Sequence, residues 1–166
     1  MTKQVLFTVL LCVIAGILQS TVIPQFSFFN VVPDLALCVL VFSAYVNGVM
    51  TGQVSGFFSG LLLDFLSSAP LGLNCLIRTI VGALAGIFKG ALFLDFFMMP
   101  VILCALATII KAILIFILNI IFGSGVPPYS IFSATLWIEL GLNCLSAPLL
   151  FFLLKKIRPL SIRRVS

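Results

Sequence analysis

The stretch GQVSGFFSGLLLDFLSSAPLGLNCLIRTIVGALAGIFKG, residues 52–90, contains two apolar segments joined by the turn sequence SSAPLG. Glycines recur every four residues in both segments, so each series lies on one face if the segment is a helix. An acidic residue ends the first series and a basic residue begins the second. The first series is Gly52, Gly56, Gly60 and Asp64, and the second is Arg78, Gly82, Gly86 and Gly90. The stretch therefore predicts an antiparallel helical hairpin in which glycine packs against glycine.

Pairing the two series in order predicts the register of this hairpin and places Asp64 opposite Arg78. The remaining predicted pairs are Gly60 with Gly82, Gly56 with Gly86, and Gly52 with Gly90. A lone Asp or Arg in the middle of a membrane helix costs about 2.5 to 3.5 kcal/mol, which favours pairing the two charges. We therefore expect an intramembrane ion pair that fixes the hairpin. A site for partner docking and an ion pathway remain open as alternative roles for Asp64.

A second possible ion pair joins Lys111 and Glu139. The two residues lie in consecutive apolar segments, at similar distances from the turn sequence GSGVPPYS. Charged residues inside membrane helices pair with one another or mark a functional site, and here both interpretations stay open.

The composition places the chain among integral membrane proteins. Of its 166 residues, 63% are hydrophobic and 8% are charged, and the mean hydropathy is +1.37. An ordinary soluble domain is about 25% charged. The apolar runs are long and continuous, which favours membrane helices over the short alternating strands of a barrel.

Six candidate spans predict an all-α fold, a six-helix transmembrane bundle. We expect a single transmembrane domain over residues 1–154, followed by a basic cytoplasmic tail over 155–166. The short NGVMTG link between the second and third spans leaves a re-entrant arrangement open there. The predicted spans cover residues 5–23, 34–50, 52–66, 71–88, 97–122 and 131–154.

The basic residues predict the orientation of the bundle. Lys3, Lys89 and the tail sequence KKIRPLSIRR fall on one side of the predicted membrane, whereas the loops on the other side carry no Lys or Arg. The positive-inside rule then places both termini in the cytoplasm. The net charge of +5 is accordingly interpreted as attraction to the lipid bilayer and not to nucleic acid.

The sequence predicts no catalysis and no cofactor. It contains no histidine, which removes the common nucleophile–histidine arrangements and histidine metal sites. Its four acidic residues form no close pair in the sequence that could serve as general acid and base.

Two motifs resemble those of the MreD family of the bacterial rod-shape machinery. The segment VVPDLALCVLVF matches an x-P-D-L helix start, and SGFFSGLLLDFLSSAPLGLNCL matches a G-x-x-x-D-x-L-S-x-x-P-L-G pattern. The resemblance covers residues 30–90 in detail and the whole chain in length and number of spans. The positions that match are Pro33, Asp34, Gly60, Asp64, Ser67, Pro70 and Gly72.

The resemblance implies a non-enzymatic scaffold in the bacterial cytoplasmic membrane. It implies association with MreC and, indirectly, with the RodA glycosyltransferase, a class B penicillin-binding transpeptidase and MreB. It also implies a fold similar to the substrate-binding components of energy-coupling-factor transporters. Two alternatives remain: a vitamin-binding component of such a transporter, and an ion carrier that uses Asp64, Lys111 and Glu139.

Overall fold

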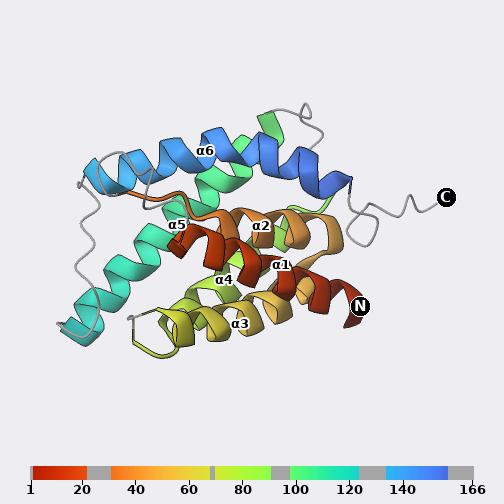
Figure 1. Ribbon diagram of the computed structural model, residues 1–166. Helices are drawn as coiled ribbons and strands as arrows, with labels where there is room; N and C mark the ends of the chain where they lie inside the picture. Colours follow the sequence, from red (N-terminus) through yellow and green to blue (C-terminus); the bar gives the residue numbers. More distant parts are fainter. Residues whose placement is uncertain (1, 22–30, 68–69, 91–97, 124–133, 157–166) are drawn as a thin grey trace.

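The computed structural model describes residues 2–21, 31–67, 70–90, 98–123 and 134–156. Over these ranges the chain is all-α, and the prediction of six helices is confirmed (Figure 1). The predicted basic tail lies outside the described residues from position 157 onward. The helices are α1 (Thr2–Thr21), α2 (Leu35–Asn47), α3 (Val49–Leu66), α4 (Leu73–Ile87), α5 (Met98–Phe122) and α6 (Ala134–Lys155).

Short sequence signals explain where the central helices begin and end. Asp34 is the N-cap of α2, where its side chain accepts a hydrogen bond from the Leu37 N–H. Gly48 alone separates α2 from α3, and its φ of +99° is readily adopted only by glycine. The chain therefore reverses sharply at Gly48, and α3 packs beside α2.

Helix α2 forms the centre of the bundle. It contacts all five other helices, and every residue from Ala36 to Ala44 is buried. A helix that is apolar on all sides is expected in an interior of this kind. Because α2 is surrounded by protein, a polar side chain at either of its ends can meet groups from several helices.

Four helices are long and apolar enough to cross a membrane, namely α1, α3, α5 and α6. Helices α2 and α4 have 13 and 15 residues, fewer than the roughly 20 needed to span the hydrocarbon core perpendicularly. That all six helices cross the membrane therefore stays a prediction.

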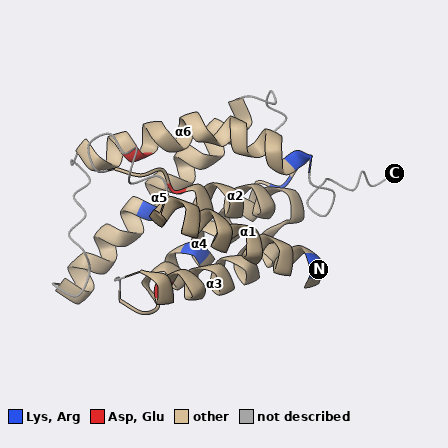
Figure 2. Cartoon of the chain, viewed as in Figure 1, with Lys and Arg blue, Asp and Glu red and all other residues tan. Residues whose placement is uncertain are grey.

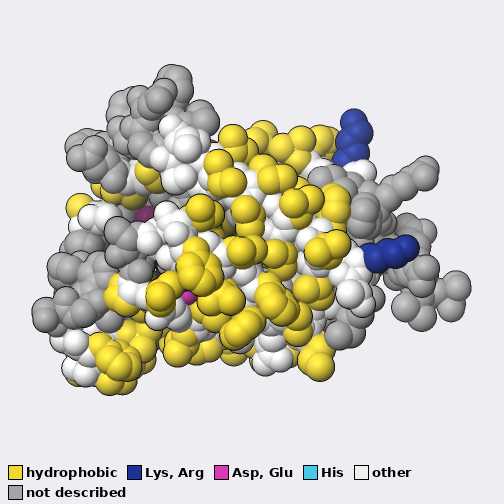
Figure 3. All heavy atoms as spheres, turned by 60° about the horizontal axis from the view of Figure 1, so that its bottom comes forward, with side chains coloured by type: hydrophobic (Ala, Val, Ile, Leu, Met, Phe, Trp, Pro, Cys, Tyr) yellow, Lys and Arg dark blue, Asp and Glu magenta, His cyan; other side chains and the backbone are white. Residues whose placement is uncertain are grey.

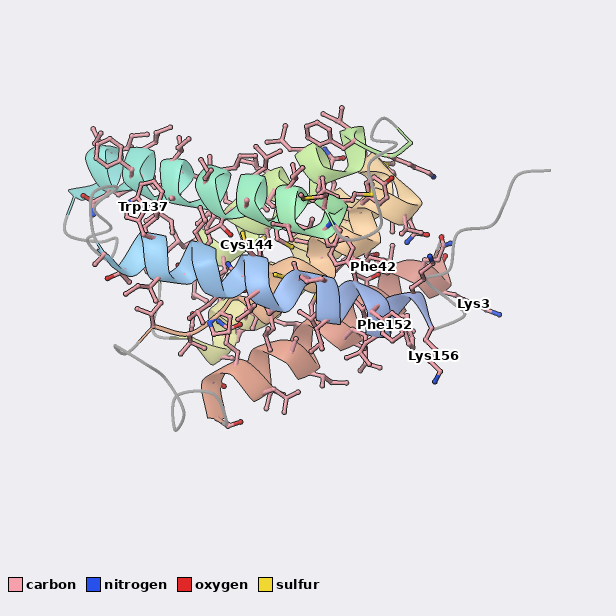
Figure 4. The ribbon with its side chains drawn as sticks, turned by 90° about the horizontal axis from the view of Figure 1, so that it is seen from above. Lys3, Phe42, Trp137, Cys144, Phe152 and Lys156 are labelled. Atoms are coloured by element: carbon pink, nitrogen blue, oxygen red, sulfur yellow. The ribbon has the colours of Figure 1, made fainter. Side chains whose placement is uncertain are left out.

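The surface is largely apolar, with lysines at one end of the bundle. Figure 3 shows hydrophobic side chains covering the middle of one face, with lysine side chains projecting at one end. Lys3 and Lys156 both lie at this end, whereas Trp137 lies at the opposite end (Figure 4). We call the end that carries Lys3 and Lys156 the lysine end. Basic residues also occur on α4 and α5, away from the lysine end (Figure 2), and the contacts of Arg78 and Lys111 define the candidate site.

Candidate functional site

The predicted glycine faces of α3 and α4 do pack against each other. A Cβ added to Gly52 would overlap the main chain of Gly82, and one added to Gly82 would overlap the main chain of Gly52. Similarly, a Cβ on Gly86 would lie 2.5 Å from Val49 Cα. Close approach of the two backbones therefore requires glycine at these positions.

The predicted register of the hairpin is wrong. Gly82 faces Gly52 and not Gly60, so the two helices are shifted by eight residues, or about 12 Å, from the predicted alignment. Gly56 instead faces the main chain of Arg78, and Gly60 faces that of Asn74 and Cys75. Gly90 lies beyond the end of α4 with a φ of +74°, and a Cβ added there would meet nothing within 4 Å.

Asp64 caps the N-terminus of α4 instead of pairing with Arg78. Its Oδ2 accepts hydrogen bonds from the N–H groups of Gly72 (2.9 Å) and Cys75 (3.1 Å), and its Oδ1 accepts one from the Asn74 N–H (2.9 Å). The first N–H groups of any helix lack partners within that helix, and a carboxylate there also complements the helix dipole. The cap holds Asp64 level with residues 72–75, which explains the shifted register.

The turn between α3 and α4 accounts for the other motif positions. Gly72, the N-cap residue of α4, has a φ of +95° and no side chain with which to cap, so the acceptor comes from Asp64. The Pro70 carbonyl accepts a hydrogen bond from the Leu73 N–H (3.1 Å). Ser67 Oγ accepts a longer one from Asn74 Nδ2 (3.4 Å). The G-x-x-x-D-x-L-S-x-x-P-L-G motif is therefore a capping structure that joins α3 to α4.

Arg78 pairs with Asp34, which follows Pro33 at the start of α2. Arg78 Nη2 donates to Asp34 Oδ1 at 2.9 Å, and both side chains are buried. Asp34 Oδ2 accepts a second charged hydrogen bond from Lys111 Nζ, at 2.8 Å. One carboxylate thus binds cations from both α4 and α5.

The predicted pair between Lys111 and Glu139 is confirmed. Lys111 Nζ donates to Glu139 Oε1 at 2.7 Å, in addition to its bond with Asp34. Glu139 is 6% exposed. Arg78, Asp34, Lys111 and Glu139 form a formally neutral chain of charges, which we call the Asp34 network.

Two polar residues that were not predicted extend the Asp34 network. The Asp34 N–H donates to Asn143 Oδ1 (2.7 Å), and Asn143 Nδ2 donates to Thr108 Oγ1 (2.9 Å). Asn143 lies one turn after Glu139 on α6, and Thr108 lies three residues before Lys111 on α5. Polar residues at these spacings share a helix face with the charged residue nearby. This spacing is the sequence signal from which Asn143 and Thr108 could have been predicted as members of the network.

The Asp34 network stabilises the bundle because each buried charge has a partner. Removing one member of a buried ion pair typically costs about 3 to 5 kcal/mol, since the remaining charge stays desolvated. Asp34, the N-cap of α2, connects that helix to α4 and α5 through its carboxylate and to α6 through its main-chain N–H, which donates to Asn143. The network therefore specifies how four helices assemble.

A cavity of about 380 Å³ lies beside the Asp34 network. Arg78 and Lys111 line it, together with residues from α1 and α3. Two buried polar atoms of its lining residues, Arg78 Nη1 and Gln19 Oε1, have no hydrogen-bond partner in the described part of the chain. We call this space the Arg78 cavity.

The described residues contain no cluster of three or more His, Cys, Asp or Glu side chains that could hold a metal ion. They do bring Asp34, the N-cap of α2, together with the charged residues of α4, α5 and α6, whereas Asp64 binds main-chain N–H groups at the start of α4. The arrangement can hold helices together and can present hydrogen-bond donors to the Arg78 cavity.

Comparison with known proteins gave one match. The family model described as rod shape-determining protein MreD matches residues 1–157. No curated protein and no solved structure matches the chain. The expected similarity to components of energy-coupling-factor transporters is therefore not shown.

Proposed function

Because the chain belongs to the MreD family of rod shape-determining proteins, we propose that it is a non-enzymatic membrane scaffold of the bacterial cell-elongation machinery. In this proposal it binds MreC by helix packing inside the membrane. Through MreC it associates with the RodA glycosyltransferase, a class B penicillin-binding transpeptidase and MreB. It resides in the cytoplasmic membrane with both termini in the cytoplasm.

The single observation that best supports a scaffold is the use of the ionisable side chains inside the bundle. Asp34, Arg78, Lys111 and Glu139 bind one another, and Asp64 binds three main-chain N–H groups. Groups held in this way stabilise helix contacts. An ion carrier would instead use Asp64, Lys111 and Glu139 along one path, and Asp64 has separate partners from the other two.

The proposed orientation is supported by the lysine end of the bundle. Lys3 and Lys156 are exposed there, and Lys89, two residues after the end of α4, donates to the main-chain oxygen of Asn47 (3.1 Å). Positive charge favours the cytoplasmic side of a membrane.

The outer faces of the helices offer surfaces for packing against another membrane helix. On α5, large apolar side chains at regular helical spacing are exposed, such as Ile109, Ile113 and Phe116. Packing between membrane helices depends on van der Waals contact and close approach, because lipid gives no hydrophobic drive for association. A partner that contributes one membrane helix could be bound in this way.

Co-purification from membranes tests the proposal with a matched pair of variants. Gly86→Gln inserts a side chain into the α3–α4 contact, whereas Gly141→Gln changes an exposed glycine of α6 whose added Cβ meets nothing within 4 Å. We expect wild type and Gly141→Gln to retain MreC and to restore rod shape in depleted cells. Gly86→Gln should retain much less MreC. Normal MreC binding by Gly86→Gln, or rod shape without any MreC binding, would contradict the proposal.

A further inference from the structure

The Arg78 cavity lies toward the end of the bundle opposite the lysine end. Gln19 and Ser20 come from the last turns of α1, the helix that begins at the lysine end. Leu66 comes from the last turn of α3, and Arg78 lies about 8 Å along α4 from its first residue, Leu73. The cavity is therefore at the depth where membrane helices approach the headgroup region.

The lining of the Arg78 cavity includes two cationic side chains that are hydrogen-bond donors, Arg78 and Lys111. A guanidinium has five N–H donors, and Nη1 of Arg78 has no partner within the described ranges, although Arg78 is only 6% exposed. An ammonium has three donors, and two of those on Lys111 bind Asp34 and Glu139. An acceptor group that entered the cavity could receive hydrogen bonds from both cations.

The carboxylate that lines the same cavity is already satisfied. Asp34 Oδ1 accepts from Leu37 and Arg78, and Oδ2 accepts from Lys111. These bonds partly compensate the negative charge of Asp34. Asp34 therefore repels an anionic ligand less than an unpaired carboxylate would. Among the fully buried side-chain atoms of the lining, those without a hydrogen-bond partner in the described residues are the donor Arg78 Nη1 and the acceptor Gln19 Oε1.

The lining of the cavity also includes apolar side chains, among them Leu63 and Leu66. A free inorganic ion would make no favourable contacts with these apolar side chains. A volume of about 380 Å³ also exceeds what one small ion fills. The lining therefore suits an amphiphile whose polar group carries anionic oxygens.

We propose that the Arg78 cavity binds a phosphate-bearing group, with Arg78 Nη1 and Lys111 donating to its oxygens and Leu63 and Leu66 contacting apolar atoms of the same molecule. Arginine and lysine side chains form charge-assisted hydrogen bonds with phosphate oxygens. Two sources share this chemistry, an anionic phospholipid and free phosphate, and the apolar lining favours the lipid. The inference does not depend on the proposed binding of MreC.

Native mass spectrometry of the full chain in neutral detergent tests this site. The probes are phosphatidylglycerol, diacylglycerol, which lacks the phosphate, and inorganic phosphate. Ser20→Phe places a ring at the cavity without changing the Asp34 network, and Leu18→Phe puts the same ring on an exposed position of α1 that does not line the cavity. Gln19→Leu is a second cavity variant that removes the unpaired acceptor.

We expect saturable binding of one phosphatidylglycerol that Ser20→Phe weakens about tenfold or more and Leu18→Phe leaves unchanged. Gln19→Leu should weaken binding by a smaller factor, and diacylglycerol should bind much more weakly. If inorganic phosphate also binds, and the same variants weaken its binding, the site is supported and free phosphate is its ligand. Equal binding of diacylglycerol, or equal binding by both cavity variants and wild type, would overturn the proposal.

Discussion

Arg78 Nη2 lies 2.9 Å from Asp34 Oδ1, although the two residues are 44 positions apart in the sequence. The contact joins the start of α2 to the middle of one face of α4. Lys111 binds the other oxygen of the same carboxylate, so Asp34 is the point at which the central helix is joined to its neighbours.

Neutralising Asp34 should strongly destabilise the bundle. Asp34→Asn leaves Arg78 and part of Lys111 without a negative partner in a buried site, and we expect a loss of about 3 to 5 kcal/mol in the free energy of unfolding. Denaturant unfolding in detergent measures this loss. Leu10→Ala, at an exposed position of α1, is the control, and an equally small effect of both changes would contradict the prediction.

Removing the Asp64 cap should have a smaller effect. Asp64→Ala leaves the N–H groups of Gly72, Asn74 and Cys75 without their acceptor, and loss of a helix cap typically costs about 0.5 to 2 kcal/mol. Hydrogen exchange should become faster at the first turn of α4 and stay unchanged in α6. Unaltered exchange at residues 72–75 would count against the cap.

Adding one methyl group to the glycine face should be costly. Gly82→Ala places a Cβ against the main chain of Gly52, and backbone cannot move aside as a flexible side chain can. We expect a loss of about 1 to 3 kcal/mol, the usual cost of overpacking. Gly141→Ala is the matched control because its Cβ meets open space, and equal stability of the two variants would refute close packing at Gly82.

Replacing Asn143 should weaken the contact between α6 and α2. Asn143→Leu removes the acceptor of the buried Asp34 N–H and the donor to Thr108, and an unsatisfied buried group costs about 1 to 3 kcal/mol. Thermal unfolding gives the size of the loss. Cys144→Leu, one position along α6 and partly exposed, provides the comparison, and a larger effect there would argue against the hydrogen bonds of Asn143.

Hydropathy and glycine spacing predicted the helices and the packed faces, but not their register. A series that repeats every four residues matches itself when one helix slides by four or eight residues, so several registers pair glycine with glycine. The choice among them is made by the Asp64 cap, which acts through main-chain N–H groups. Such a bond has no partner side chain that a sequence pattern could reveal.

The partner of Arg78 was missed for a related reason. The prediction joined Arg78 to the nearest carboxylate in the hairpin, whereas Asp34 reaches it only because α2 packs against α4 in three dimensions. Lys111 and Glu139 were paired correctly, since consecutive helices joined by one turn bring residues at equal distances from the turn together.

The most direct test of this account is a pair of double-mutant cycles on the unfolding free energy, one for Asp34 with Arg78 and one for Asp64 with Arg78. The structure predicts a coupling energy of about 1 to 3 kcal/mol for the first pair and near zero for the second, since Asp64 and Arg78 share no hydrogen bond. Coupling confined to Asp64 and Arg78, or rescue of Asp64→Arg by Arg78→Asp, would contradict the account.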